Sequence, residues 1–193
     1  MIVPTLPNAI LLVPLGGVFV HFSIAGGRTF YFVADGSGVA AIVAEVVFYG
    51  MGTGVTWWLG LHQAIPPANQ WAATLLLLTS LGLYEWARHI IWGRRFGVGW
   101  GVHVPEALCD GGPYRYIRHP IYTSYVLGYL AVLVALPHWI TAAVFLFNLA
   151  LWVGCARRDE RVLADSALAA DYAAYCKRTG MFLPKLSSTA PGR

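Results

Sequence analysis

Long apolar stretches dominate the chain, and short polar segments separate them. Five stretches approach the roughly 20 apolar residues that a bilayer-spanning helix requires: 7–25, 38–61, 71–92, 120–136 and 139–156. Only Pro137 and His138 separate the last two, so these are expected to form a tight helical hairpin. The pattern therefore predicts an all-α, integral membrane bundle of about five transmembrane helices.

A helical pattern continues after the last apolar stretch. Small or apolar residues recur there at helical spacing, namely Leu163, Ala167, Ala170 and Ala174. We expect the fifth span to run straight on into a cytoplasmic helical tail that reaches about residue 177. Gly180 and Pro184 are expected to end this helix, because neither residue favours helix continuation.

Composition supports a membrane location, and the distribution of charge predicts an orientation. Hydrophobic residues make up 58% of the chain and charged residues 11%, less than half the ~25% of a typical soluble domain. Basic residues gather at or after the end of the third stretch and in the tail, whereas residues 61–70 and the turn at Pro137 have none. Because cytoplasmic loops are enriched in Lys and Arg, the N-terminus is predicted outside and the C-terminus inside.

The same features exclude several classes of function. No nucleic-acid motif is present, and contact with the lipid bilayer accounts for the basic residues. Cys109, Cys155 and Cys176 are widely spaced without a C-x-x-C pair, so neither a disulfide framework nor a zinc site is predicted. Histidines at 21, 62, 103 and 138 lack metal-ligand spacing and are interpreted as loop or interface residues. The first apolar stretch lacks a basic n-region and is interpreted as a retained helix.

The polar segment 111–124 lies directly before and within the start of the fourth stretch. His119 precedes Pro120, and proline is favoured at the first position of a helix, so a helix is predicted to begin at Pro120. Free N–H groups at a helix start attract anions, and Arg115 and Arg118 add positive charge. A small anionic or zwitterionic ligand at the cytoplasmic membrane surface is predicted. The alternative is that the two arginines only follow the positive-inside rule.

Two linked motifs resemble those of a known enzyme family. The run from Gly112-Pro113-Tyr114 through Arg118-His119-Pro120 to Tyr122 resembles the signature of isoprenylcysteine carboxyl methyltransferases and their phospholipid methyltransferase relatives. The second motif resembles the ending of the same family, and consists of Asp159-Glu160-x-x-Leu163, Tyr172, Tyr175 and Phe182-Leu183-Pro184. Together they cover about residues 111–185.

The resemblance implies a methyltransferase that uses S-adenosylmethionine at the cytoplasmic ends of the last helices. The residues that it places around this cofactor are Gly112, Pro113, Tyr114, Arg118, His119, Pro120, Tyr122 and Glu160. Arg118 and Glu160 are the candidate catalytic residues, and no general base is assigned. The acceptor is expected to be lipophilic or membrane-delivered. Residues 1–186 would form one transmembrane methyltransferase domain with its cofactor region at about 94–186, and 187–193 a disordered tail.

The chain departs from the family pattern at three places. Ser124 stands where the family usually has glycine, although Ser124 and Gly128 still form a small-xxx-small face that allows close helix packing. Asp159 replaces the first glutamate of the acidic pair. Ala167-Leu168 replaces a common Phe-Gly.

Three further features remain, and two of them have two interpretations. Glu45, in the second stretch, faces a substrate cavity or is protonated and hydrogen-bonded to a neighbouring helix. Glu85 is expected to form a local pair with Arg88 or His89 at helical spacing. The glycines of 97–101 resemble a cofactor-binding motif of phospholipid methyltransferases, or form a flexible loop.

Several acceptors and several functions remain open. A prenylated-cysteine carboxylate, a phospholipid amine and a small thiol are all compatible acceptors. A membrane sterol reductase that uses a nicotinamide cofactor is an enzyme of another class with a similar C-terminal architecture. A small transporter or assembly factor is the non-enzymatic alternative.

Overall fold

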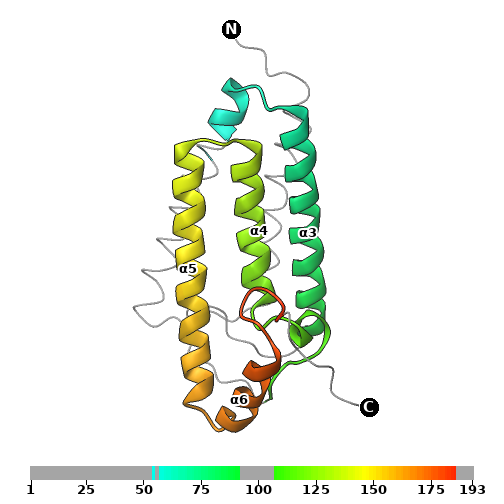
Figure 1. Ribbon diagram of the computed structural model, residues 1–193, viewed down its shortest axis with the longest axis vertical. Coiled ribbons are helices and arrows are strands. Elements are labelled where there is room, and N and C mark those ends of the chain that lie inside the picture. Colours follow the sequence, from blue (N-terminus) through cyan, green and yellow to red (C-terminus); the bar gives the residue numbers. More distant parts are fainter. Residues whose placement is uncertain (1–53, 55–56, 92–106, 186–193) are drawn as a thin grey trace.

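The computed structural model describes residue 54 and residues 57–91 and 107–185. Three long helices lie side by side and alternate in direction: α3 (Pro67–Ile91), α4 (Pro120–Ala135) and α5 (Trp139–Ala164), with α4 in the middle (Figure 1). The 3-10 helix η1 (Gly112–Arg115) precedes α4, and α6 (Ala169–Arg178) follows α5. Residues 57–62 are also helical. No strand occurs in the described part of the chain, which agrees with the predicted all-α class.

The helical hairpin is confirmed, and the number of spans remains a prediction. The predicted stretches 71–92, 120–136 and 139–156 correspond to α3, α4 and the first part of α5. Among the described residues, α5 is long and apolar enough to cross a membrane, and α4 is a shorter apolar helix. The stretch 7–25, most of 38–61, and Glu45 lie outside the described residues, as does the glycine motif at 97–101.

Helix α3 packs on α4 through one stripe of buried residues at three- and four-residue spacing: Ala73, Leu77, Ser80, Tyr84, Ala87 and Ile91. Small residues in this stripe let the two backbones approach closely. Ser80 Oγ donates a hydrogen bond to the carbonyl oxygen of Ser124, at 2.6 Å. Both serines are fully buried, so this bond satisfies a polar group inside the bundle.

The turn between α4 and α5 contains its own helix cap. His138 Nδ1 accepts a hydrogen bond from the backbone N–H of Ile140 (3.2 Å), and Thr141 Oγ1 accepts one from the N–H of His138 (3.2 Å). This reciprocal pair satisfies N–H groups that have no partner within the helix. Asn69 also donates from Nδ2 to the carbonyl oxygen of Val134, at 2.8 Å, and so attaches the start of α3 to the end of α4. His138 therefore has a structural role in this turn.

The prediction of one continuous helix from the fifth span to residue 177 is partly wrong. Helix α5 continues past its apolar part to Ala164, but the chain then turns before α6 begins at Ala169. Ser166 stabilises the turn: its Oγ donates to the carbonyl oxygen of Leu163 (2.7 Å) and accepts from the N–H of Leu168 (3.1 Å). Serine side chains of this kind compete with helical hydrogen bonds, which the spacing of apolar residues does not reveal.

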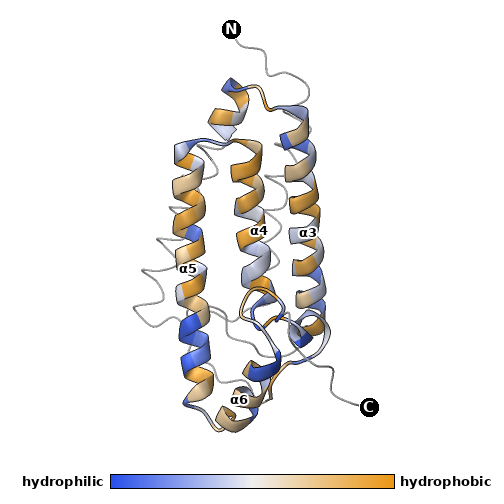
Figure 2. Ribbon diagram, viewed as in Figure 1, coloured by the Kyte–Doolittle hydropathy of each residue, from blue (hydrophilic) through white to orange (hydrophobic). Residues whose placement is uncertain are grey.

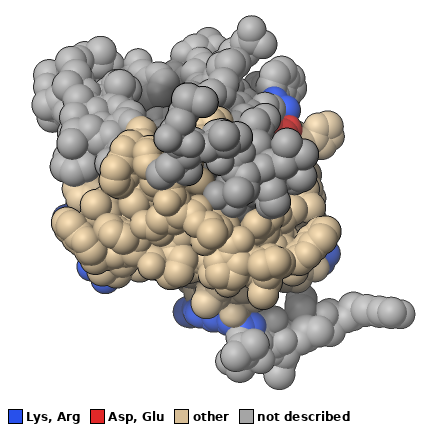
Figure 3. Space-filling model, turned by 90° about the horizontal axis from the view of Figure 1, so that it is seen from above, with Lys and Arg blue, Asp and Glu red and all other residues tan. Residues whose placement is uncertain are grey.

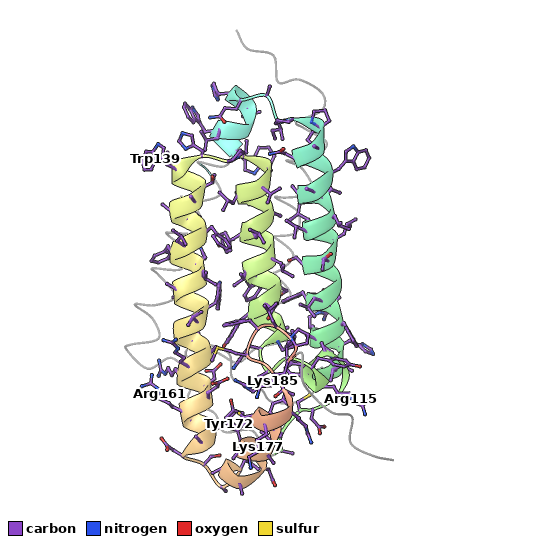
Figure 4. The ribbon with its side chains drawn as sticks, in the orientation of Figure 1. Arg115, Trp139, Arg161, Tyr172, Lys177 and Lys185 are labelled. Carbon is purple, nitrogen blue, oxygen red and sulfur yellow. The ribbon has the colours of Figure 1, made fainter. Side chains whose placement is uncertain are left out.

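Charged residues collect at the end of the bundle where α3 ends, α4 begins and α5 ends, called the lower end below. The last turns of α5 are accordingly hydrophilic (Figure 2). Arg115, Arg161, Tyr172, Lys177 and Lys185 all lie there, opposite Trp139 (Figure 4). Seen from the opposite, upper end, the described surface consists mostly of uncharged residues (Figure 3). Among the described residues, the basic side chains thus lie on one side of the bundle, as the sequence predicts.

Candidate functional site

The start of α4 has the predicted form. Pro120 is the first helical residue and is fully buried, and His119 is the cap residue with φ −123° and ψ 60°. The His119 side chain makes no capping hydrogen bond to the helix. The first N–H groups of a helix have no acceptor within it, and the imidazole does not supply one here.

The C-terminal segment lies beside the residues that lead into α4. The N–H of Arg118 donates to the carbonyl oxygen of Gly180 (2.8 Å), and the N–H of His119 donates to that of Met181 (3.1 Å). In the other direction, the N–H of Gly180 donates to the carbonyl oxygen of Tyr116 (3.2 Å). Ile117 and Gly180 accordingly form an isolated parallel bridge. These backbone bonds position Arg118 and His119 against the end of the chain.

Arg118, His119 and Glu160 form the centre of the site. Arg118 Nε donates to Glu160 Oε1 at 2.7 Å, and His119 Nε2 lies 3.3 Å from the same oxygen. A second donor of Arg118, Nη1, binds the carbonyl oxygen of Thr179 at 2.6 Å. The side chains of Arg118 and His119 are 11% and 10% exposed, and that of Glu160 is 20% exposed. The cluster is thus sheltered but keeps partial contact with solvent.

The charges of this cluster stabilise the ionised form of Glu160. The apolar part of α5, residues 139–156, contains no charged residue, and Glu160 lies beyond it. Burial by itself would raise the pKa of the Glu160 carboxyl, but hydrogen bonds from His119 and Arg118 outweigh burial and lower that pKa from 4.5 to about 2. Glu160 is therefore a carboxylate at every physiological pH.

Asp159, the neighbouring acid, has a different environment. Tyr122 OH donates to Asp159 Oδ2 at 2.8 Å. Burial raises the pKa of Asp159, and the hydrogen bond from Tyr122 and the nearby His119 and Arg158 oppose this only in part. The two adjacent carboxyls therefore differ in the direction of their pKa shifts.

Aromatic rings form a wall along the inner side of the site. The His119 ring stacks on that of Tyr122, with ring centres 5.4 Å apart and planes at 5°. Tyr122 in turn stacks on Trp152 of α5, with centres 5.1 Å apart, and Phe182 lies against His119 from the C-terminal segment. Aromatic faces attract cations and apolar groups alike.

The predicted cofactor residues in η1 are Gly112, Pro113 and Tyr114, and their contacts run to neighbouring helices. Gly112 has a φ of 55°, and a Cβ there would lie 2.6 Å from Ile90 Cγ1 of α3, so glycine is required. Pro113 is fully buried. The carbonyl oxygen of Tyr114 accepts a hydrogen bond from Tyr175 OH at 2.6 Å. The contacts that hold these residues thus run to α3 and α6, while Arg118, His119, Tyr122 and Glu160 come together around the start of α4.

Some residues at the site carry no role in the sequence-based interpretation. Thr179 is fully buried, and its carbonyl oxygen binds Arg118. Trp152 contributes the inner ring, and its buried Nε1 has no hydrogen-bond acceptor among the described residues. A backbone carbonyl leaves no signature in the sequence. For Trp152, the available signal is its spacing of seven residues before Asp159, which places both on one face of α5.

The structure also describes Ser124, the pair of Glu85 and Arg88, and the surroundings of the possible metal ligands. The hydroxyl of Ser124 donates to the carbonyl oxygen of Ile121 in its own helix, at 2.6 Å, so it is not directed into the site. Glu85 and Arg88 form the predicted local pair, with Arg88 Nε 3.0 Å from Glu85 Oε2. No three His, Cys, Asp or Glu side chains come together as metal ligands within the described ranges.

Comparison with known families agrees with these features. The family model for phospholipid methyltransferases matches residues 68–166, about half of the chain. The match runs from α3 to just beyond α5, so it includes the start of α4 and both acids. No curated protein matches the chain significantly. The chain therefore belongs to the phospholipid methyltransferase family, whose members are membrane methyltransferases.

Proposed function

We propose that this protein transfers a methyl group from S-adenosylmethionine to a lipophilic acceptor at the cytoplasmic membrane surface. The observation that carries the proposal is the sheltered cluster of Arg118, His119 and Glu160, located where the apolar helical hairpin meets its charged end. The family match supports the methyl-transfer chemistry. The gathering of basic side chains at the lower end supports its cytoplasmic location.

The chemistry of the cluster fits this methyl donor. S-adenosylmethionine carries a carboxylate, an ammonium group and a cationic sulfonium. Arg118 and the N–H groups at the start of α4 suit the carboxylate, and Glu160 suits the ammonium group. Because Arg118 and Glu160 already neutralise each other, a zwitterionic end can pair with both without leaving a buried charge alone. The stacked rings of His119 and Tyr122 provide an aromatic face for the sulfonium.

The acceptor is proposed to approach from the bilayer. The uncharged part of α5 ends at residue 156, only one helical turn before Glu160. Leu146 and Phe147 are exposed on the apolar part of this helix. A lipid-soluble acceptor lying along α5 therefore reaches the cluster with its polar end. Lateral delivery of this kind keeps bulk water out of the site.

The protein's contribution to catalysis is then mainly positioning. The bound donor supplies an electrophilic methyl group that is displaced in line, without a covalent bond to the protein. Arg118 and Glu160 hold the charged groups in place, and the rings of Tyr122 and Trp152 close the inner side of the site. Alignment of two reactants in this way accounts for about 7–11 kcal/mol of barrier reduction in favourable cases.

Binding calorimetry on purified protein in detergent tests the proposal. Wild type is expected to bind S-adenosylmethionine and S-adenosylhomocysteine, and not NADPH. Glu160→Gln and His119→Ala are expected to weaken binding at least about tenfold, since each removes a hydrogen bond to a charged group worth about 1.5–3 kcal/mol. Arg178→Ala, which removes the exposed ion pair with Asp110, serves as the control and is expected to bind normally. Wild-type protein that binds neither adenosyl compound would overturn the proposal.

Product analysis identifies the acceptor. Methyl-labelled donor is incubated with the protein and a total membrane lipid extract, and labelled products are separated and identified. Label in a lipid amine, in a carboxyl ester or in a thioether assigns the acceptor class. Label that enters no lipophilic product, while small water-soluble thiols are methylated, contradicts a lipophilic acceptor.

A further inference from the structure

Two adjacent acids at the site have opposite electrostatic environments. Glu160 is bound by the guanidinium of Arg118 and by the imidazole of His119. Asp159 Oδ2 accepts a hydrogen bond from the neutral phenol of Tyr122 at 2.8 Å. When the environments of two carboxyls separate their proton affinities, the pair is suited to two different roles. Glu160 is assigned to the ammonium group of the methyl donor, whereas Asp159 has no assigned role.

Asp159 lies at the end of a buried stripe on α5. Asn148, Trp152 and Cys155 are buried residues of this helix at four- and three-residue spacing, and Asp159 continues the series. The ring of Tyr122 connects the two parts: it stacks on Trp152 while its hydroxyl binds Asp159. Asp159 is therefore the first carboxylate reached along the face that α5 presents to α4.

Trp152 provides an independent sign that a ligand lies along this stripe. Its side chain is 6% exposed, and its indole N–H has no acceptor among the described residues. An unsatisfied buried donor of this kind costs about 1–3 kcal/mol. A polar atom of a bound acceptor molecule would satisfy it. Seven helical residues correspond to about 10 Å, so the same molecule can reach Asp159 with its reactive end.

Partial burial raises the proton affinity of Asp159. Burial raises its pKa, while the phenol of Tyr122 and the nearby His119 and Arg158 oppose the rise, and Glu160 adds to it. These are the groups from α4 and from α5 itself that act on Asp159. A carboxylate with raised proton affinity takes up a proton more readily than Glu160, whose pKa is held at about 2.

We propose that Asp159 accepts the proton of the methyl acceptor, whose attacking atom is therefore one that carries a proton, as in an amine or a thiol. This inference rests on the proposed methyltransferase function and specifies its chemistry. A carboxylate acceptor needs no deprotonation, and the negative charge of Asp159 would repel it. Asp159 thus selects against acids as well as serving as a base.

The step balances in atoms and charge. An N–H or S–H proton of the acceptor passes to Asp159 Oδ, and the freed electron pair forms the new bond to the methyl carbon. The bond between that carbon and the donor's sulfur breaks, and its electrons remain on sulfur. The proton then leaves Asp159 for solvent, so the site returns to its starting state. Tyr122 keeps the carboxylate oriented throughout by donating to Oδ2.

Substitution of Asp159 by asparagine gives a readout that does not depend on turnover. A raised pKa in the folded protein means that the charged form of Asp159 destabilises the fold as pH rises through that pKa. Asparagine has no such charge and can still accept the bond from Tyr122. Asp159→Asn is therefore expected to melt at the wild-type temperature or above it near neutral pH, and the difference should disappear in acid. Asp165→Asn, at the exposed acid that directly follows this helix, is the control and should leave the melting temperature unchanged at both neutral and acidic pH.

Turnover provides the second readout. Labelled donor is supplied with two acceptor probes, a long-chain primary amine and a long-chain thiol. Asp159→Asn is expected to lower the rate about 100-fold or more and to abolish the fall in rate at acidic pH, while Asp159→Glu restores part of the activity. Binding of S-adenosylhomocysteine should stay within about twofold of wild type, because the cofactor groups are assigned to Arg118 and Glu160.

The outcomes separate this inference from the proposed function. Wild-type protein that fails to bind either adenosyl compound overturns both. Wild-type protein that binds them, with an Asp159→Asn variant that is clearly less stable near neutral pH, assigns Asp159 a structural role and overturns the inference alone. An Asp159→Asn variant with wild-type rate and pH profile, or methylation of a fatty carboxylate in preference to both probes, also overturns it.

Discussion

The body of the helical bundle and its lower end are held together by different forces. In the body, α4 packs against α3 and α5 mainly through apolar and small residues, and the polar contact between Ser80 and Ser124 involves no charge. At the lower end, directed bonds join segments far apart in the chain. Arg118 binds Thr179, and Tyr175 binds Tyr114, each across 61 residues.

This difference shows where sequence changes are tolerated. In a bilayer, lipid is as apolar as the side chains, so helices associate through close packing and a few weak hydrogen bonds. Many apolar residues satisfy such packing. A hydrogen-bonded ion cluster requires particular atoms at particular distances. A substitution in the body should therefore cost less stability than a comparable substitution at the lower end.

The largest effect is expected from adding a single methyl group at Gly180. A Cβ there would lie 1.8 Å from the carbonyl oxygen of Leu183, a backbone atom that cannot rotate away. Gly180→Ala is expected to lower the free energy of unfolding by about 3 kcal/mol and to displace Arg118, whose N–H binds Gly180. Thermal unfolding in detergent and calorimetry with S-adenosylhomocysteine measure both effects.

Gly154, in the body of α5, is the matched control. A Cβ there meets no atom within 4 Å. Gly154→Ala is expected to be neutral or to stabilise by up to about 1 kcal/mol, since alanine favours helix over glycine. Equal losses of stability at Gly154 and Gly180 would contradict the difference between the two regions.

An intermediate effect is expected at Glu160. Its lowered pKa means that its carboxylate stabilises the fold fully above pH 4.5 and loses this contribution as pH falls toward about 2. Glu160→Gln is expected to lower stability at neutral pH by about 1–2 kcal/mol. The gap between wild type and variant should narrow between pH 4.5 and about 2.

Unfolding curves recorded across that pH series measure the gap. Asp110→Asn, at the exposed ion pair with Arg178, is the control, because surface pairs contribute only about 0–1 kcal/mol. A gap for Glu160→Gln that stays constant down to acid pH would show that its charge does not stabilise the fold.

The smallest effect is expected at Ser80, inside the body. Ser80→Ala removes the hydrogen bond to the Ser124 carbonyl and is expected to lower stability by on the order of 0.5 kcal/mol. S-adenosylhomocysteine affinity should not change, because the hydroxyls of both serines bind backbone carbonyls within the bundle and not the ion cluster. A large loss of affinity on Ser80→Ala would mean that packing in the body positions the site directly.

Much of the fold follows from local patterns. The hairpin of α4 and α5 was predictable because a run of apolar residues and a short Pro137-His138 break are both local signals. The start of α4 at Pro120 was predictable for the same reason. The break between α5 and α6 was not, because Ser166 ends the helix through its own side-chain bonds, while the apolar spacing continues past it.

The site divides in the same way. The sequence motifs singled out Arg118, His119, Tyr122 and Glu160 as site residues, and these four surround the start of α4. They did not indicate that Thr179 would supply a backbone oxygen, or that Trp152 would form the inner wall. Such roles depend on which atoms of distant segments meet, and neither a carbonyl oxygen nor a ring stack has a signature in the sequence.

The sequence by itself determined the helical class, the hairpin, the family and the set of polar residues at the charged end, because periodicity, composition and short motifs are properties of neighbouring residues. The tertiary structure alone decided how the two adjacent acids differ. Glu160 meets Arg118 and His119, whereas Asp159 meets the phenol of Tyr122 in a partly buried position. Proton affinity depends on the charges and solvent around a group, and these are assembled only when the helices and the C-terminal segment pack together.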